Sequence, residues 1–224
     1  MDIFLDMTGT ITSMESEDYA FLKMCEAIKK RFNIDMGARE LMEHILEFRR
    51  PYMENRHVEY YPIRNLIVKA VEKIVPKRLC SSDAFWIMDA YSEFHARYVK
   101  LAPRAKEGLD ILREISKHLG LITDADTPYT QKVLKGLGIE HYFDSVTTAE
   151  DAGVGKPNPK IFEMALKNSR ENLKIYIGDS EKRDIVGAKN VGIVAIKIGG
   201  ESRIADYTAT NLFDAAKIIK DIIL

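Results

Sequence analysis

Hydrophobic and polar positions along the chain change their period near residue 100. The apolar run Ile3, Phe4 and Leu5 is short and ends at Asp6, as expected for a buried β-strand. From residue 16 to about residue 100, apolar residues recur three and four positions apart, with no strand-like alternation between them. This long stretch therefore predicts helices only.

Proline and polar residues divide the helical stretch into four predicted helices. Ser16 is predicted to cap the first, while Pro51 and Pro76 are predicted to end the second and the third, because proline lacks the amide that a continuing helix needs. The fourth is predicted to begin near Ser82 or Asp83. The predicted segments are 16–32, 41–51, 63–76 and 82–98.

From Pro103 onward, helical and strand-like segments alternate. Strands are predicted at 119–123, 144–148, 173–177, 193–198 and 207–210, and helices at 106–117, 129–137, 159–167, 184–190 and 213–224. This alternation predicts a doubly wound α/β fold with a mostly parallel sheet. The first strand belongs to that sheet, so we expect a catalytic core of residues 1–14 plus 101–224 and an inserted all-helical cap of residues 15–100.

Composition and charge narrow the class of protein. The 224 residues include 33 Lys and Arg against 34 Asp and Glu, a net charge of −1, so no global field attracts nucleic acid or an anionic membrane. Cys25 and Cys80 lack the spacing of a zinc site. The chain begins directly with a core strand, and no apolar stretch is long enough for a bilayer. We expect a cytoplasmic monomer or small homo-oligomer that binds neither nucleic acid nor membrane.

Asp6 is the first candidate for chemistry, because it ends a buried strand and is followed by Thr8, Gly9 and Thr10. Open α/β sheets bind their ligands at the carboxyl ends of parallel strands. An aspartate held there can act as a nucleophile that forms a covalent intermediate. An ordinary strand-to-turn junction is the alternative, since Asp and Gly are common turn residues.

Two later segments carry groups that can hold phosphate. Thr123 and Asp124 end a predicted strand, where a hydroxyl and backbone amides can bind phosphate oxygens, although Thr is also a common strand residue. Lys156 lies in the loop 153–158 just before Pro159, and could extend over the nucleophile. The alternative for Lys156 is a surface lysine.

A third strand end adds acidic residues. Asp179 follows the predicted strand 173–177, and Asp184 lies near the start of the next helix. Alone, Asp179 could be a turn residue, and Asp184 an acid favoured by the helix dipole. Together with Asp6 they form an oxygen-rich set suited to Mg²⁺, which keeps waters and takes substrate phosphate as a ligand.

These segments resemble the four ordered motifs of the haloacid dehalogenase superfamily with an inserted helical cap. The resemblance covers essentially the whole chain and implies a sheet order of 3-2-1-4-5. It implies that Asp6 is the nucleophile, and that Mg²⁺ is held by Asp6, the carbonyl of Thr8 and Asp179, with support from Asp184. It also implies that the substrate phosphate is bound by Thr10, Thr123, Asp124 and Lys156.

Thr8 departs from the pattern of this superfamily. Most of its phosphatases have a second aspartate two residues after the nucleophile, which acts as general acid and then as general base. Such help is worth roughly a hundred- to ten-thousand-fold in rate, and threonine cannot supply it. We expect either that Asp6 is phosphorylated readily only by substrates with good leaving groups, or that the cap supplies the missing group. Thr8→Asp is then predicted to raise phosphatase turnover.

Three functions remain open from the sequence. The first is an Mg²⁺-dependent phosphohydrolase for a small phosphorylated metabolite, with Arg49, His57 and Arg64 of the cap as possible substrate contacts. The second is a metal-independent 2-haloacid dehalogenase, in which Asp6 would displace halide from carbon. The third is a weakly catalytic phosphate-binding or regulatory domain. The acidic pair Asp179 and Asp184 favours the first, whereas Thr8 keeps the third open.

Overall fold

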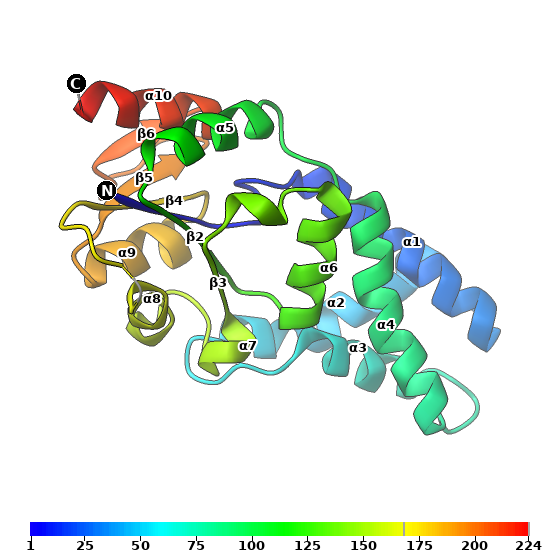
Figure 1. Cartoon of the computed structure of the whole chain (residues 1–224). Helices are drawn as coiled ribbons and strands as arrows, with labels where there is room; N and C mark the ends of the chain where they lie inside the picture. The colour runs from blue at the N-terminus through cyan, green and yellow to red at the C-terminus, as the bar shows by residue number, and fades with distance from the viewer. Residues whose placement is uncertain (168, 224) are drawn as a thin grey trace.

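A six-stranded parallel sheet forms the centre of the computed structural model, which describes residues 1–167 and 169–223 (Figure 1). Its order is β3-β2-β1-β4-β5-β6. The predicted order 3-2-1-4-5 is therefore confirmed, and the predicted last strand extends the β5 edge. The strands are β1 (Asp2–Leu5), β2 (His118–Thr123), β3 (Ser145–Thr148), β4 (Lys174–Gly178), β5 (Val194–Ile198) and β6 (Tyr207–Ala209).

Both faces of the sheet are buried, as parallel sheets require. Ile3 and Leu5 of β1 point into one hydrophobic cluster, and Phe4 points into the other, because side chains alternate along a strand. The first cluster includes side chains from α5 (Ala105–Ile115), α6 (Thr127–Leu137) and α10 (Leu212–Ile223). The second includes side chains from α7 (Ala149–Ala152), α8 (Pro159–Leu166), a π-helical turn (Glu181–Ile185) and α9 (Val186–Asn190). A short 3₁₀ turn (Glu140–Tyr142) precedes β3.

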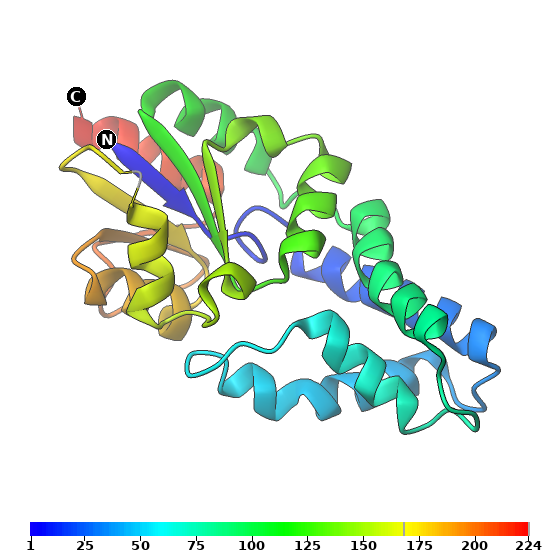
Figure 2. The same ribbon diagram turned by 60° about the horizontal axis from the view of Figure 1, so that its bottom comes forward.

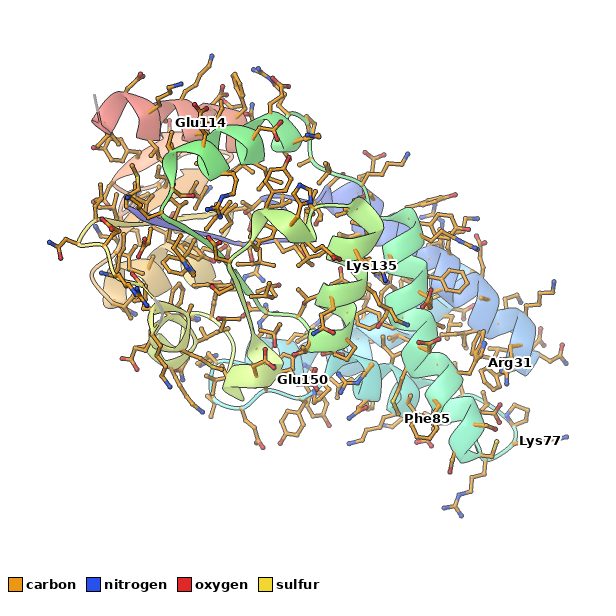
Figure 3. All side chains as sticks on the ribbon, in the orientation of Figure 1. Arg31, Lys77, Phe85, Glu114, Lys135 and Glu150 are labelled. Atoms are coloured by element: carbon orange, nitrogen blue, oxygen red, sulfur yellow. The ribbon has the colours of Figure 1, made fainter. Side chains whose placement is uncertain are left out.

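The stretch predicted to be helical consists of α1 (Met14–Phe32), α2 (Ala38–Glu54), α3 (Ile63–Glu72) and α4 (Ser81–Tyr98). Figure 2 shows α2 and α3 set apart from the sheet, and in Figure 3 Lys77 and Phe85 mark the end remote from it. Helix α4 packs on α6 of the sheet layer, and one hydrophobic cluster continues from the sheet into α1. Since the inserted helices and the sheet layer share this packing, it does not separate two domains. The domain bounds 1–14 plus 101–224 and 15–100 therefore stay a prediction.

Several predicted helix ends were wrong. Ser13 caps α1 in place of Ser16, because its side chain accepts the Ser16 amide at 3.4 Å. Pro51 lies inside α2, which continues to Glu54, since proline removes only one amide and the Asn55 amide still bonds the Pro51 carbonyl. Helix α3 ends at Glu72, before Pro76. Within the described residues, none of the helices combines the length and apolar character needed to cross a membrane.

Candidate active site

The turn after β1 holds Asp6 at the carboxyl edge of the sheet. The Asp6 amide donates to the Ile177 carbonyl at 2.9 Å, so the residue continues the pairing of β1 with β4. Gly9 has a φ of +86°, and a Cβ placed on it would lie 2.6 Å from a carboxylate oxygen of Asp179. Only glycine fits there without strain. The turn thus brings Asp6 and Asp179 to one place, and the Thr10 hydroxyl donates to Asp6 Oδ2 at 3.4 Å.

Lys156 is fully buried beside Asp6. Its ammonium nitrogen lies 2.5 Å from Asp6 Oδ1 and 2.6 Å from Asp184 Oδ1, and it also contacts the Tyr176 hydroxyl at 3.0 Å. Its backbone amide donates to Asp124 Oδ1 at 2.7 Å. Asp124 therefore fixes the loop that carries Lys156, while two carboxylates fix the ammonium group.

Two acidic residues after β4 complete the cluster. A Cβ on Gly178 would lie 2.5 Å from the Asp184 side chain, so this glycine lets Asp184 pack under the strand end. Asp184 Oδ2 accepts the Ser180 amide at 2.9 Å. Oxygen atoms of Asp6, Asp179 and Asp184 lie within 4.8 Å of one another. The ends of β1 and β4 thus supply one compact acidic site.

Burial and mutual repulsion control ionisation in this cluster. Burial raises the pKa of Asp6 to about 7, against the lowering effect of Lys156 and with a further raising effect from Asp184 and Asp179. Burial and the charge of Asp184 also raise the pKa of Asp179. Asp184 differs: burial raises its pKa, but Lys156, the Ser180 amide and Arg183 together outweigh burial and hold the pKa below its usual range. One ammonium group therefore faces more negative charge than it can neutralise.

This arrangement fits a divalent cation. Asp179 Oδ1 is buried and has no hydrogen-bond partner among the described residues, whereas buried carboxylate oxygens are normally satisfied. It lies next to Asp6, which shares the same excess of negative charge. Carboxylate oxygens are the ligands that Mg²⁺ prefers. Asp6 and Asp179 are accordingly the residues available to hold such an ion, with Asp184 behind them.

A cavity of about 220 Å³ opens between the sheet edge and the inserted helices. Asp6, Thr8, Thr123 and Asp124 line its sheet side. Its helical side is largely apolar and includes Met42, Leu46 and Met53 of α2, Phe21 of α1 and Ile63 of α3. A small molecule in this cavity would meet the Asp6 carboxylate on one side and the inserted helices on the other.

The three predicted substrate contacts from the inserted helices occupy different places. Arg49 lines the cavity. His57 is exposed, and its Nδ1 lies 3.1 Å from the Glu54 carbonyl. Arg64 pairs with Glu150, labelled in Figure 3, at 2.6 Å and with Asp126 at 3.2 Å. Of the three, only Arg49 is among the cavity-lining residues.

Two arginines that are not among the three predicted substrate contacts also reach the cavity. Arg56 and Arg183 lie 3.5 Å and 3.6 Å from Asp124 Oδ2, and both line the cavity. Arg183 directly precedes Asp184, and this adjacency is a sequence signal that Arg183 lies near the site. Nothing in the sequence connects Arg56 to Asp124.

Glu17 of α1 is a residue of the cavity that sequence reasoning missed. It accepts hydrogen bonds from the Thr12 hydroxyl at 2.7 Å and the Tyr129 hydroxyl at 2.5 Å. Burial raises the pKa of the Glu17 carboxyl, and the neighbouring hydroxyls of Tyr129, Thr12 and Thr8 act against it. A single glutamate in an amphipathic helix carries no sequence signal for such a cluster, because its partners come from distant segments.

Comparison with known proteins gives consistent matches over most of the chain. The family model of haloacid dehalogenase-like hydrolases matches residues 3–192. A glyceraldehyde 3-phosphate phosphatase of Methanocaldococcus jannaschii is 27% identical, with 98% of this chain and 97% of the relative covered. A phosphatase structure from Thermococcus onnurineus has a TM-score of 0.71 at 24% identity, covering 97% of both chains. An L-2-haloacid dehalogenase from Xanthobacter autotrophicus has a TM-score of 0.72 at 14% identity, covering 98% of both chains.

Proposed function

Because the chain belongs to the family of haloacid dehalogenase-like hydrolases, we propose that it is an Mg²⁺-dependent phosphohydrolase for a small phosphorylated metabolite. The proposal rests above all on the buried Asp6 carboxylate, which lies 2.5 Å from Lys156 and lines a small cavity. The phosphatase relatives support phosphorus over carbon as the atom attacked.

The proposed reaction has two steps. A carboxylate oxygen of Asp6 attacks phosphorus, the bond from phosphorus to the substrate oxygen breaks, and the leaving alkoxide takes a proton. Water then attacks the aspartyl-phosphate and gives up a proton, so that inorganic phosphate leaves and the Asp6 carboxylate is restored. Lys156 would hold Asp6 in position and offset the repulsion between the carboxylate and the incoming phosphate.

The remaining predicted residues have roles that suit their positions. Thr123 lines the cavity at the end of β2, and we propose that its hydroxyl and the following amide of Asp124 bind phosphate oxygens. Thr10 would orient Asp6 through its hydrogen bond to Oδ2. Asp6, Asp179 and the Thr8 carbonyl would hold Mg²⁺, which when bound neutralises phosphate charge and aligns it for attack.

A phosphate-release assay tests this proposal. Purified protein is given p-nitrophenyl phosphate, an acyl phosphate, phosphoglycolate and sugar phosphates, with Mg²⁺ or with a chelator. We expect Mg²⁺-dependent release, loss of it in Asp6→Asn, and an acid-stable, base-labile phosphoryl group on Asp6 after a rapid quench. Tight binding of a phosphate analogue without that phosphoryl group would instead identify a weakly catalytic binding domain.

Halide release separates the dehalogenase alternative. The same protein is incubated with 2-chloropropionate in a chelator, where a metal-independent dehalogenase would release chloride through an ester on Asp6. We expect no chloride. Asp179 and Asp184 form an acidic cluster beside Asp6, and a metal-independent dehalogenase has no use for such a cluster. Chloride release without phosphate release would overturn the proposal.

A further inference from the structure

Arg49 is unusual among the arginines of the cavity. Arg56 and Arg183 both pair with Asp124, at 3.5 Å and 3.6 Å. Within the described residues, no carboxylate oxygen lies within 4.0 Å of a nitrogen of Arg49, and no hydrogen bond from its guanidinium is formed. Arg49 thus brings to the helical side of the cavity a positive charge that no carboxylate of the described residues pairs with directly.

The surroundings of Arg49 compensate only part of this charge. Its guanidinium lies over the Phe21 ring, 5.0 Å from the ring centre, an attraction weaker than a hydrogen-bonded pairing with an anion, and burial lowers its pKa. Glu17, one of the acids of the same cavity, already accepts from the hydroxyls of Thr12 and Tyr129. Arg49 is half-buried, so its guanidinium is less well solvated than in open water, and it cannot lose its proton. Such a group is stabilised when an anion binds to it.

The shape of the cavity limits what that anion can be. At about 220 Å³ the cavity is smaller than the roughly 300–1,000 Å³ of pockets that hold drug-sized ligands. The phosphate of the substrate has to lie at Asp6, on the sheet side. Apolar side chains of α2, such as Leu46 and Met53, surround the remaining space. The rest of the substrate is therefore a short carbon chain, whose far end meets Arg49.

We propose that Arg49 binds a carboxylate at the end of the substrate remote from its phosphate, so that the preferred substrate is a short-chain phosphorylated carboxylic acid. The planar guanidinium can donate two parallel hydrogen bonds to a carboxylate, a geometry that an aldehyde or an alcohol does not offer. This inference rests on the proposed phosphohydrolase function and adds the chemical class of its substrate.

Three substrates with one carbon skeleton test the proposal. They are 3-phosphoglycerate, glyceraldehyde 3-phosphate and glycerol 3-phosphate, which end in a carboxylate, an aldehyde and an alcohol. We expect kcat/KM of the wild type to be about 10- to 100-fold higher for the acid, in keeping with hydrogen bonds to charged groups. Arg49→Met, which keeps the apolar stem, is expected to remove this preference through a larger loss of kcat/KM for the acid than for the aldehyde or the alcohol.

Arg50→Met is the matched control, because Arg50 is exposed on the same helix and does not line the cavity. It should retain the preference for the acid. If Arg49→Met does not fold, Arg49→Lys, which keeps the charge but loses the planar fork, should weaken the preference. A wild type without preference for the acid, or an equal loss on all substrates in Arg49→Met, would overturn the proposal.

A binding measurement separates this proposal from the proposed function. In the inert Asp6→Asn protein, 3-phosphoglycerate should raise the melting temperature more than glycerol 3-phosphate does, and Asp6→Asn/Arg49→Met should respond equally to both. This difference persists even if no substrate is hydrolysed by the wild type, in which case phosphohydrolysis fails while the carboxylate site stands. An equal response of Asp6→Asn to both compounds refutes the carboxylate site, whatever the activity.

Discussion

Thr8 lies two residues after the proposed nucleophile Asp6 and lines the same cavity. Its side chain lies near Glu17 and lowers the pKa of that carboxyl, and both residues line the cavity that Asp6 faces. A threonine hydroxyl does not supply a proton at neutral pH, so this position has no acid of its own. A carboxyl group introduced there would face Glu17, and two neighbouring carboxyl groups raise the pKa of one another.

Thr8→Asp is expected to raise turnover of phosphate esters with poor leaving groups by about 100-fold, because a carboxyl of raised pKa can protonate the leaving oxygen. Esters with good leaving groups, such as p-nitrophenyl phosphate, should gain much less. Steady-state kinetics on both types of ester provides the measurement. Thr8→Asn is the matched control, since it has similar size without the acid. Unchanged or lower turnover in Thr8→Asp would count against the account of Thr8 given above.

His95 carries a pH dependence of stability. Burial lowers the pKa of His95 to about 4 in the folded chain, while an unfolded histidine has a pKa near 6.5. Below pH 6.5 the unfolded state therefore binds a proton at this histidine that the folded state does not bind. The free energy of unfolding falls as the pH drops toward 4.

For the wild type, this difference predicts a loss of about 2 kcal/mol in the free energy of unfolding between pH 7 and pH 5 from His95 alone. His95→Phe keeps an aromatic ring beside Phe21 and Tyr129 but cannot titrate. Urea unfolding at both pH values should show a correspondingly smaller loss in this variant. Equal losses in the two proteins would show that His95 is not the source.

Helix α3 begins with a cap that comes from another part of the chain. The residue before it is Pro62, whose side chain cannot accept the free amides of a first helical turn. Asp126, at the start of α6, accepts the Ile63 amide at 2.7 Å, the Arg64 amide at 2.9 Å and the Tyr60 hydroxyl at 2.5 Å. One buried carboxylate thus joins the sheet layer to the inserted helices.

Asp126→Ala is expected to destabilise the chain by about 3 kcal/mol, because it leaves several buried donors and the Arg64 charge without their acceptor. Unfolding in urea gives the total loss, and hydrogen exchange should locate the earliest weakening at the first turn of α3. Asp89→Ala is the control, since Asp89 forms an exposed ion pair with Lys132 and should change stability by less than about 1 kcal/mol. A similar loss in both variants would contradict a special role for Asp126.

Folding of the whole molecule gathers three carboxylates beside a single ammonium group, that of Lys156, so negative charge at the acidic site stays in excess. Asp6, Asp179 and Asp184 come together only in the folded chain, so a cation that they bind should stabilise it against unfolding. At a Mg²⁺ concentration a hundred times the dissociation constant, the gain is about 2.7 kcal/mol.

For a chain of this size, that gain corresponds to a rise of roughly 5–10 °C in melting temperature. Asp179→Asn should lose most of this rise, because it removes the carboxylate whose Oδ1 is buried without a partner in the described chain. Glu114→Gln is the control, since Glu114 is exposed on α5 (Figure 3) and does not line the cavity. Differential scanning calorimetry with and without Mg²⁺ provides the comparison. An equal Mg²⁺ effect in Asp179→Asn and the wild type would place the ion elsewhere.

The positions of the strands and of the acids at their ends were predictable from local signals, whereas the order of the strands came from the resemblance to the haloacid dehalogenase superfamily. Buried strands are marked by apolar runs such as Ile3 to Leu5, and the acids at their ends are adjacent in sequence to those runs. Helix ends were less predictable, because a proline such as Pro51 costs one hydrogen bond, which packing of the rest of α2 can outweigh. Local propensity is a weak preference that tertiary contacts override.

The sequence by itself determined which residues stand at strand ends, and therefore where Asp6, Thr123 and Asp179 lie, since period and turn chemistry act over a few neighbouring residues. The tertiary structure alone decided that Glu17 meets Thr8, that Asp126 caps α3, and that Arg49 faces the cavity while Arg64 pairs with Glu150. These contacts join segments far apart in the chain, and their existence depends on how the inserted helices pack against the sheet edge. Charge pairing between distant residues leaves no period in a sequence, so only the folded chain reveals it.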